Sequence, residues 1–514
     1  MTQPTFNLLD EPWIGAVDAN GTLNEYSLRE LLAQAPHLRA LHDDSPLVIA
    51  AVLRMLLALL HRVYDGPRNS REWKAIWATK DGFDMARIER YFVQWHSRFD
   101  LFDSEHPFYQ TIHAAVDKQT KSIASLLPEL STGNNATLFD HTTDANDVVL
   151  SAEEAARAVV AAQTFGLAGL CNPQLQLNFT DSTATRGMIL IAEGNSIFET
   201  LVLNLIEYPA EKPIASSATD RPAWEMEDAY APDREQPQGY LDYLTWQNRR
   251  LLLMPETNDS GIVVRSIALT PGLRLDATFL ARDPMKHYRV DEKLGYLAKR
   301  FSEDRALWRD SAALLRFKST EQQPPAVLDW LARLAEGGRP VLDDHYSLRC
   351  MALGMASNQA KIDFFRSEHV PLPPAYLKEP ELVDLLTKAL EAAENTASEL
   401  WKASSTMAAV LLVPDEESGR SANSDDVQSL RDTMGTERRY WAGLEPLFRE
   451  TMQALPEQAI EAMRRWFGWL REAAWATFEE VSEGLGDTPR ALKAVVRGRE
   501  QLAQGLGKVL NFEA

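Results

Sequence analysis

The sequence predicts an α+β protein with a large mixed N-terminal domain over residues 1–375 and a C-terminal four-helix bundle over residues 376–514. Apolar residues recur at helical spacing through the C-terminal part, whereas short apolar runs bounded by turn residues alternate with helical patterns before it. With 514 residues, 45% of them hydrophobic, the chain is also long enough to bury more than one core.

Helices and short strands are both expected in the N-terminal domain. Helical patterns occupy 26–64, 85–98 and 151–166, and strand patterns occupy Arg186–Gly194, Arg249–Pro255 and Gly261–Gly272. The most apolar run, Pro46–Val63, contains Arg54 and is shorter than the roughly 20 residues that span a bilayer. We therefore expect this run to form a buried helix.

Amphipathic helices make up the predicted bundle, and segments rich in helix-stopping and N-capping residues separate them. The four helices are expected at 378–412, 425–454, 457–483 and 488–509. Aromatic side chains such as Trp466 and Phe478 follow the third helix. They are interpreted as bundle core with a partly exposed face, and a ligand or cofactor box is the alternative.

Composition sets limits on function and compartment. The formal net charge of −21 argues against a solitary nucleic-acid-binding protein, because Lys and Arg supply most non-specific affinity for phosphate. A local basic patch, or binding as a subunit of an assembly, stays possible. The two cysteines, Cys171 and Cys350, allow neither a disulfide framework nor a four-Cys zinc site. No secretory signal is visible at the N-terminus, so a cytoplasmic protein is expected.

Catalytic signatures are sparse. The sequence contains no Walker A loop, GxGxxG, HExxH, GxSxG or paired CxxC motif. Two His and Asp groups, His42–Asp44 and Asp140–His141, could suggest a metal site, but such sites need more ligands than this spacing supplies. We predict no catalytic residue, no metal and no cofactor. A metal-dependent hydrolase that uses these groups is kept as an alternative.

Distinctive segments in collinear order carry a family resemblance. They are FNLLDEPWIGA (Phe6–Ala16), LFDSEHPFYQT (Leu101–Thr111), TLFDH (Thr137–His141), EGNSIFETLVLNL (Glu193–Leu205), DRPAWE (Asp220–Glu225), YLTWQNRRLLL (Tyr243–Leu253), GMASNQAKI (Gly354–Ile362) and GTERRYWAGLEPLFRE (Gly435–Glu450). Their order and separation resemble the CasA family, the large subunit of the type I-E CRISPR surveillance complex Cascade. The resemblance covers nearly the whole chain.

The resemblance implies a non-catalytic subunit of an RNA-guided complex. Such a subunit recognises the protospacer-adjacent motif in double-stranded DNA from the minor groove, and it helps to open the duplex so that guide RNA can pair in an R-loop. Its implied partners are CRISPR RNA, double-stranded target DNA, the backbone and small subunits of Cascade, and the effector helicase-nuclease, with no membrane. A helical scaffold without a DNA role is a further alternative.

In the family, a Gln-containing hairpin acts as a wedge beneath the motif, and the matching residues here are Asn358, Gln359 and Ala360. Amide side chains can both donate and accept, which suits the degenerate minor-groove pattern while the tip stays uncharged. Gly354 and Ser357 would let the backbone approach DNA closely. The alternative is an ordinary surface turn whose amides face water.

Two further elements of the family lie against the minor groove. A glycine-rich loop aligns with Ala161–Gln174 and contributes Gly166 and Gly169, which alternatively cap a helix and allow close packing. A groove-entering cation has three candidates in the segment that follows the strands. These candidates are Arg274, Arg282 and Lys286. Each could instead be a solvated surface charge.

A docking loop and a basic helix face complete the implied contacts. The loop Ser131–Asp147 would meet the 5′ end of the guide RNA and the backbone subunits, with Asn135, Phe139 and His141 as its candidate contact residues. Its Asn, Gly and Asp content also fits a mobile loop. Basic residues on the last helices could follow a displaced strand or meet a small subunit, or could form a solvated face. They are Arg464, Arg465, Arg471, Arg490, Lys493, Arg497 and Arg499.

Overall fold

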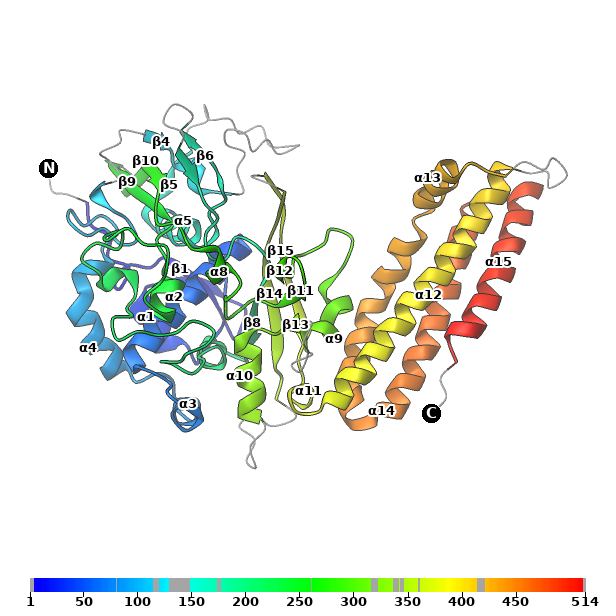
Figure 1. Ribbon diagram of the computed structural model, residues 1–514, viewed down its shortest axis with the longest axis horizontal. Coiled ribbons are helices and arrows are strands. Elements are labelled where there is room, and N and C mark those ends of the chain that lie inside the picture. The colour runs from blue at the N-terminus through cyan, green and yellow to red at the C-terminus, as the bar shows by residue number, and fades with distance from the viewer. Residues whose placement is uncertain are drawn as a thin grey trace. The chain divides into compact units, whose positions relative to one another are not determined.

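The chain folds into two compact units (Figure 1). The computed structural model describes residues 4–79, 81–113, 120–128, 148–172, 177–259, 261–315, 322–335, 342, 346–358, 361–413 and 421–511. Unit 1 consists of Met1–Ala306 and Phe317–His369, and unit 2 of Leu307–Arg316 and Val370–Ala514. Unit 1 mixes helices with strands and unit 2 is mainly helical, so the predicted α+β class is confirmed.

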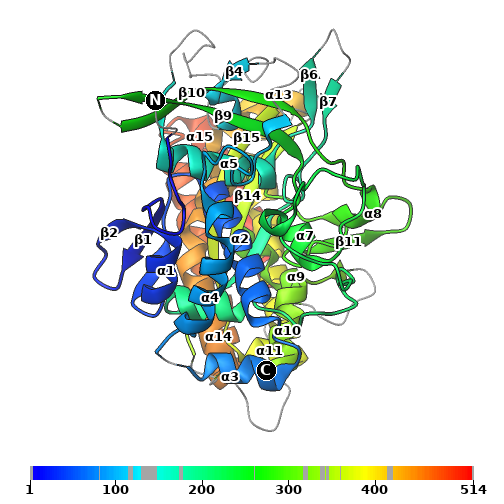
Figure 2. The same cartoon turned by 90° about the vertical axis from the view of Figure 1, so that its left-hand side faces the viewer.

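α2 (Pro46–Tyr64) is the central helix of unit 1. It begins after Ser45 with proline in its first turn and ends at Asp65, which adopts the left-handed conformation. It contacts α4 (Met85–Trp95), α5 (Ala152–Phe165), α7 (Tyr240–Leu244) and β14 (Arg349–Asn358) (Figure 2). The predicted buried helix is confirmed. Its length and composition would suffice to cross a membrane, but most of it is buried inside unit 1.

The remaining helices of unit 1 are short. They are α1 (Leu28–Gln34), α3 (Ser70–Trp77), α6 (Ile197–Leu203), α8 (Ala277–Leu280) and α10 (Ala326–Ala335), with the 3-10 turns η1 (His96–Phe99), η3 (Ile123–Leu126) and η4 (Ala223–Glu225). The single helical pattern expected at 26–64 is wrong, because β3 (Leu38–Leu41) separates α1 from α2. Pro36 directly follows the C-cap of α1 and Pro46 begins α2, and proline favours both positions because it disfavours the helical conformation of the residue before it and suits the first turn of a helix.

Strands of unit 1 form several small sheets. Besides β3 and β14 they are β1 (Ile14–Asp18), β2 (Leu23–Tyr26), β4 (Thr120–Ser122), β5 (Leu150–Ser151), β6 (Gly169–Asn172), β7 (Leu177–Phe179), β8 (Ile189–Glu193), β9 (Arg249–Asn258), β10 (Gly261–Pro271), β11 (Tyr288–Asp291), β12 (Gly295–Ala298), β13 (Gln322–Gln323) and β15 (Lys361–Pro371). The strand orders are β2-β1-β3, β4-β10-β5 with β9 on β10, β12-β11-β13, β15-β14-β8 and β6-β7. β14 and β15 are neighbours in their sheet, and Asn358 of the predicted wedge is the last residue of β14.

Unit 2 is built around α12 (Pro380–Leu412). This helix packs against α13 (Ser424–Met434), α14 (Thr436–Glu483) and α15 (Pro489–Val509), and Figure 1 shows α12, α14 and α15 side by side. Trp466 and Phe478 on α14 are fully buried, and the indole N–H of Trp466 donates to the carbonyl oxygen of Ala389 at 2.8 Å. The interpretation of these two aromatic side chains as bundle core is confirmed.

The single helix expected at 425–454 is wrong, because the helix is interrupted at Gly435, between α13 and α14. Gly435 adopts φ +64°, a left-handed conformation that ends a helix and that glycine reaches without strain. α14 then continues through Pro446 and Pro456, with non-helical angles only at Gln458. The helix end expected near Pro456 is therefore a kink, as proline removes a hydrogen bond without forcing the chain to turn back.

A short segment before the bundle also belongs to unit 2. Leu307–Arg316 contains η5 (Leu307–Asp310) and α9 (Ser311–Leu314), and α9 contacts α12. The ring centroid of Trp308 lies 4.7 Å from that of Phe448. Arg309 pairs with Glu394 at 2.9 Å and lies 3.5 Å from the ring centroid of Trp441. The domain boundary predicted from the sequence, after residue 375, places this segment in the N-terminal domain.

Candidate nucleic-acid interface

The segment Asp181–Met188, termed the linking segment, connects three regions of unit 1 that the sequence predicted to contact DNA. It lies between β7 and β8. It forms hydrogen bonds with the loop after α5, with Lys286, and with the β14–β15 hairpin. These regions are far apart in the sequence, so the linking segment defines one candidate site.

Gly166 lies at the end of α5, where its N–H donates to the carbonyl oxygen of Ala162 at 3.0 Å. Its own carbonyl oxygen accepts from Ser182 N at 2.9 Å and from Thr185 Oγ1 at 2.8 Å. A Cβ on Gly166 would lie 2.5 Å from Nη2 of Arg249, so a side chain has no room. Its φ of −57° suits any residue. The structure therefore uses Gly166 as a helix cap with close packing.

The rest of the glycine loop is fixed to the linking segment as well. The N–H of Ala168 donates to Oδ1 of Asp181 at 2.8 Å. Gly169 begins β6 and pairs with Phe179 of β7. Leu170 beside it is 56% exposed. The loop thus combines a fixed backbone with an exposed edge.

Arg249 holds the loop from the first position of β9. Its Nη2 donates to the carbonyl oxygen of Leu167 at 2.7 Å and its Nη1 to that of Thr180 at 3.0 Å. Burial lowers the pKa of this guanidinium to about 10. Arg249 was not among the site residues predicted from the sequence. Strand alternation was the available signal, since Arg249 shares its buried face with Leu251 and Leu253.

The three candidate cations occupy different environments. The side chain of Arg274 is 74% exposed and lies 4.0 Å from Glu235, and Arg282 is exposed with its guanidinium 5.1 Å from the ring centroid of Phe279. Lys286 is buried, and its Nζ donates to the carbonyl oxygen of Thr183 in the linking segment at 2.8 Å. Burial lowers the pKa of Lys286 to about 8. Only the two arginines present their charge at the surface in this conformation.

The turn between β11 and β12 carries an exposed lysine that was not among the predicted cations. The N–H groups of Lys293 and Leu294 both donate to Oδ1 of Asp291 at 2.9 Å, and Gly295 adopts φ +73°. Lys293 is exposed and Leu294 is 71% exposed. The Asp and Gly residues between two alternating apolar runs are the signal that could have identified this turn.

The β14–β15 hairpin is anchored next to the linking segment. Arg186 Nη1 donates to Oγ of Ser357 at 2.8 Å, at the end of β14. A Cβ on Gly354 would lie 3.2 Å from the carbonyl oxygen of Gly187, so Gly354 allows close backbone packing within the protein. Gln359, Ala360 and the side chain of Asn358 lie outside the described residues. The predicted wedge thus begins where the described part of β14 ends.

Comparisons with known proteins identify the family. The sequence model of the CRISPR-associated protein Cse1 family matches residues 7–477. The chain belongs to the Cse1 family, also called CasA. It is 33% identical over 513 residues to the CRISPR-associated protein CasA/Cse1 of Thermus thermophilus, covering 98% of each chain. The predicted resemblance to CasA of type I-E Cascade is confirmed.

Solved structures of the Cse1 family share this fold over the whole chain. The crystal structure of Thermus thermophilus CasA gives a TM-score of 0.80 at 29% identity, covering 98% of this chain and 100% of that chain. Thermobifida fusca Cse1 gives 0.79 at 26% identity, with 98% of both chains covered. Acidimicrobium ferrooxidans Cse1 gives 0.85 at 24% identity and 99% coverage of both chains, a likeness of fold.

Two predicted features of this Cse1-family chain lie partly or wholly outside the described residues. Asn135, Phe139 and His141 of the docking loop are outside them, as is the pair Asp140–His141 of the hydrolase alternative. In the other group of that alternative, Asp43 Oδ1 accepts from Ser45 N at 2.8 Å, and Asp43 Oδ2 lies 3.4 Å from Nε of Arg157. Within the described part of the chain, no group of three His, Cys, Asp or Glu residues is placed to hold a metal ion.

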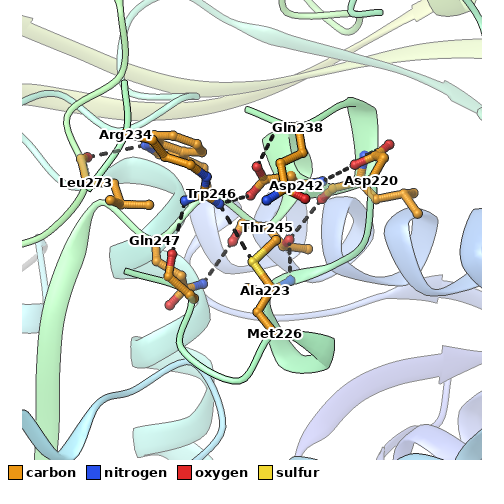
Figure 3. A network of polar contacts seen from close by, with 12 residues as sticks. Asp220, Ala223, Met226, Arg234, Gln238, Asp242, Thr245, Trp246, Gln247 and Leu273 are labelled. Carbon is orange, nitrogen blue, oxygen red and sulfur yellow. Dashed lines mark hydrogen bonds and ion pairs between the residues drawn. The ribbon is translucent and has the colours of Figure 1, made fainter. Parts of the chain in front are cut away.

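Buried carboxylates near α7 of the Cse1-family chain are engaged in structural contacts (Figure 3). Asp220 accepts from the backbone N–H groups of Leu241 and Asp242 at 3.1 and 3.0 Å. Asp242 pairs with Arg234 at 2.7 Å and accepts from Gln238 N at 2.7 Å. Burial raises the pKa of Asp242 to about 6. Both side chains hold α7 against the segment that precedes it.

Basic residues on the last helices of the Cse1-family bundle lie close to acidic or carbonyl groups. The ion pairs are Arg464–Glu461, Arg465–Glu450, Arg497–Glu500 and Arg499–Glu479. Arg471 donates to the carbonyl oxygen of Leu510 at 3.2 Å, and Arg490 to that of Leu411 at 3.2 Å. This arrangement favours the solvated helix face among the predicted alternatives.

Proposed function

We propose that the chain is a non-enzymatic subunit of a type I-E Cascade complex in the cytoplasm. In that complex it recognises the protospacer-adjacent motif from the minor groove of double-stranded DNA, wedges the duplex open for R-loop formation, and provides a docking surface for the effector helicase-nuclease. Its further partners are CRISPR RNA and the backbone and small subunits. Membership of the Cse1 family supports the assembly into such a complex.

The linking segment is the observation that carries this proposal. It hydrogen-bonds to Gly166 on one side and to Ser357 on another, and Met188 N donates to the carbonyl oxygen of Lys299 at 2.9 Å. A duplex that meets the glycine loop would therefore also be near the wedge hairpin, formed by β14 and β15, and near the residue that follows β12. Recognition and opening require such proximity, because the first base pair to open adjoins the motif.

The chemistry of the tip residues suits the proposed task. Asn358 and Gln359 carry amides that can meet both the acceptors of the minor groove and the guanine amino group. They carry no charge, so insertion between base steps does not bury an ion. Unstacking costs about a few kcal/mol per step, and a side chain that fills the gap offsets part of that cost. The exposed cations Arg274, Arg282 and Lys293 would be attracted by the minor-groove potential.

Duplex opening by the reconstituted complex tests the proposal. A fluorescent base analogue beside the motif reports opening, and wild type is compared with Gln359→Ala and with Asn258→Ala, an amide control at the β9–β10 hairpin. We expect Gln359→Ala to slow opening of duplex DNA and to spare binding to pre-opened DNA, while the control behaves as wild type. Equal opening in all three proteins would contradict the wedge and would favour a scaffold role.

A further inference from the structure

We propose that Arg186 is a positioning residue that couples the glycine loop to the wedge hairpin, so that contact with the motif at the loop sets the position of Ser357 near the end of β14. The wedge hairpin denotes β14 and β15. This inference rests on the proposed function and assigns its internal connection to one guanidinium. Arg186 itself need not touch DNA.

Arg186 is joined to the glycine loop through Asp181. Its Nε lies 2.7 Å from Oδ2 of Asp181 and its Nη2 lies 3.3 Å from Oδ1, a two-point contact that fits the planar guanidinium to the carboxylate. Oδ1 of Asp181 also accepts from the backbone N–H of Ala168 at 2.8 Å. A shift of the loop backbone at Ala168 would therefore move the carboxylate that orients Arg186.

The third nitrogen of Arg186 reaches the wedge hairpin. Nη1 donates to Oγ of Ser357 at 2.8 Å. Ser357 directly precedes Asn358 and is two positions before Gln359. The hydrogen-bonded path Ala168, Asp181, Arg186, Ser357 thus ends at the base of the predicted wedge. All three guanidinium nitrogens are used, so Arg186 bridges two regions and does not merely neutralise a carboxylate.

The backbone around Arg186 is fixed on both sides, which allows a small displacement to be transmitted. Thr185 Oγ1 donates to the carbonyl oxygen of Gly166 at 2.8 Å, directly before Arg186. Gly187, directly after it, adopts φ +88°, and a Cβ there would lie 2.7 Å from Cβ of Ala298. Only glycine suits that position. The side chains of Arg186 and Asp181 are 27% and 20% exposed, so water screens their interaction only in part.

Substitutions at both ends of the bridge separate coupling from charge and from folding. Arg186→Lys keeps the charge but cannot make the two-point contact and reach Ser357 together. Ser357→Ala removes the acceptor, whereas Ser357→Thr keeps a hydroxyl and suits a strand. Arg68→Lys is the matched control, because Arg68 is exposed and pairs with Asp65 in its own neighbourhood.

The readout is discrimination, measured in the reconstituted complex as the ratio of opening rates on duplexes with the motif and with a mutated motif. We expect Arg186→Lys and Ser357→Ala each to lower this ratio by about fivefold or more, the range typical of coupling between sites. Ser357→Thr and Arg68→Lys should retain it. The double variant Arg186→Lys with Ser357→Ala should be no worse than the poorer single variant, as expected for two residues of one path.

Several outcomes would overturn the inference. Wild-type discrimination in Arg186→Lys, with Gln359→Ala still defective in opening, would refute the coupling and leave the proposed function intact. Wild-type discrimination in Arg186→Lys together with wild-type opening in Gln359→Ala would refute the proposed function as well. Equal slowing on both duplexes by Arg186→Lys, with weaker binding to pre-opened DNA, would show a general structural role and refute the coupling.

Discussion

His61 is a buried side chain that makes unit 1 sensitive to acid. It lies on α2, fully buried, with Nδ1 2.9 Å from the carbonyl oxygen of Gly66. Burial lowers the pKa of the imidazole from 6.5 to about 4. The ring is therefore neutral at physiological pH. Because a carbonyl oxygen only accepts, Nδ1 carries the proton in this neutral ring.

Substitution of His61 should reduce the loss of stability in mild acid. Between pH 6.5 and about 4 the unfolded chain binds a proton at this residue more readily than the folded chain does, so stability falls as pH falls. The largest contribution is about 1.4 kcal/mol per pH unit. His61→Gln removes the titration and keeps an amide donor for Gly66. Urea unfolding at several pH values should show a shallower acid dependence in the variant.

A second buried group, Asp242, also titrates in this pH range. Wild type must therefore be compared with the His61→Gln variant at each pH. The folded pKa of Asp242, about 6, lies above the ordinary 3.8, so the folded chain takes up this proton first. Protonation of Asp242 therefore adds stability as pH falls through that window, opposite in sign to His61. The difference between wild type and His61→Gln cancels the Asp242 contribution. An identical acid dependence in both proteins would contradict the assignment to His61.

The junction between α5 and the glycine loop can be tested as an element. In Gly166→Ala the new Cβ would lie 2.5 Å from Arg249 Nη2 and 2.8 Å from the carbonyl oxygen of Ala162. Arg249 must then move away from the loop carbonyl groups that it holds. Overpacking of this kind costs about 1–3 kcal/mol, so the thermal midpoint of the variant should fall.

Gly443 offers the matched control for that substitution. It lies on α14, is exposed, and a Cβ there would have no atom within 4 Å. Gly443→Ala should leave stability unchanged or raise it by about 0.5–1 kcal/mol, because alanine restricts the unfolded chain and favours helix. If Gly166→Ala were as stable as Gly443→Ala, the close packing between Gly166 and Arg249 would not contribute as described.

Elements with a strong local pattern could be predicted from the sequence, and those defined by distant contacts could not. Apolar spacing identified α12, α15 and the buried α2, since a helix that buries one face has apolar residues at helical spacing in its own sequence. The break at Gly435 was missed because a helical pattern tolerates a single glycine. The arrangement of side chains in the candidate site was also predicted only in part. Nothing local separates the buried Lys286 from the exposed Arg282, or shows that Arg186 reaches Ser357.

Charge acts at the scale of the whole molecule. With a net charge of −21, the protein repels DNA at long range, so binding must depend on a few local cations and on the partners in the complex. Each cation that contacts a phosphate steepens the dependence of log affinity on log salt concentration by about one. The slope of log affinity against log salt concentration therefore reports the number of phosphate contacts, which the net charge of the whole chain does not reveal.

Removal of the exposed arginines should flatten that salt dependence. In the reconstituted complex on motif-bearing duplex, Arg274→Ala with Arg282→Ala should reduce the slope by about one for each residue that contacts a phosphate. Arg464→Ala, which removes a bundle arginine paired with Glu461, serves as the control and should leave the slope unchanged. An unchanged slope in the double variant and a lower slope in Lys293→Ala would contradict the choice of arginines and point to the β11–β12 turn.

The assignment of Leu307–Arg316 to unit 2 has a consequence for how the gene can be cut. The chain passes from one unit to the other after Ala306, after Arg316 and after His369. A bundle excised at Val370 would lack Trp308 and Leu314, which are 3% exposed in the intact chain. The remaining fragment would in turn carry these apolar side chains without the helices that cover them. The two units therefore cannot be exchanged between homologues by a single crossover, and a functional chimera must transplant the bundle in two pieces.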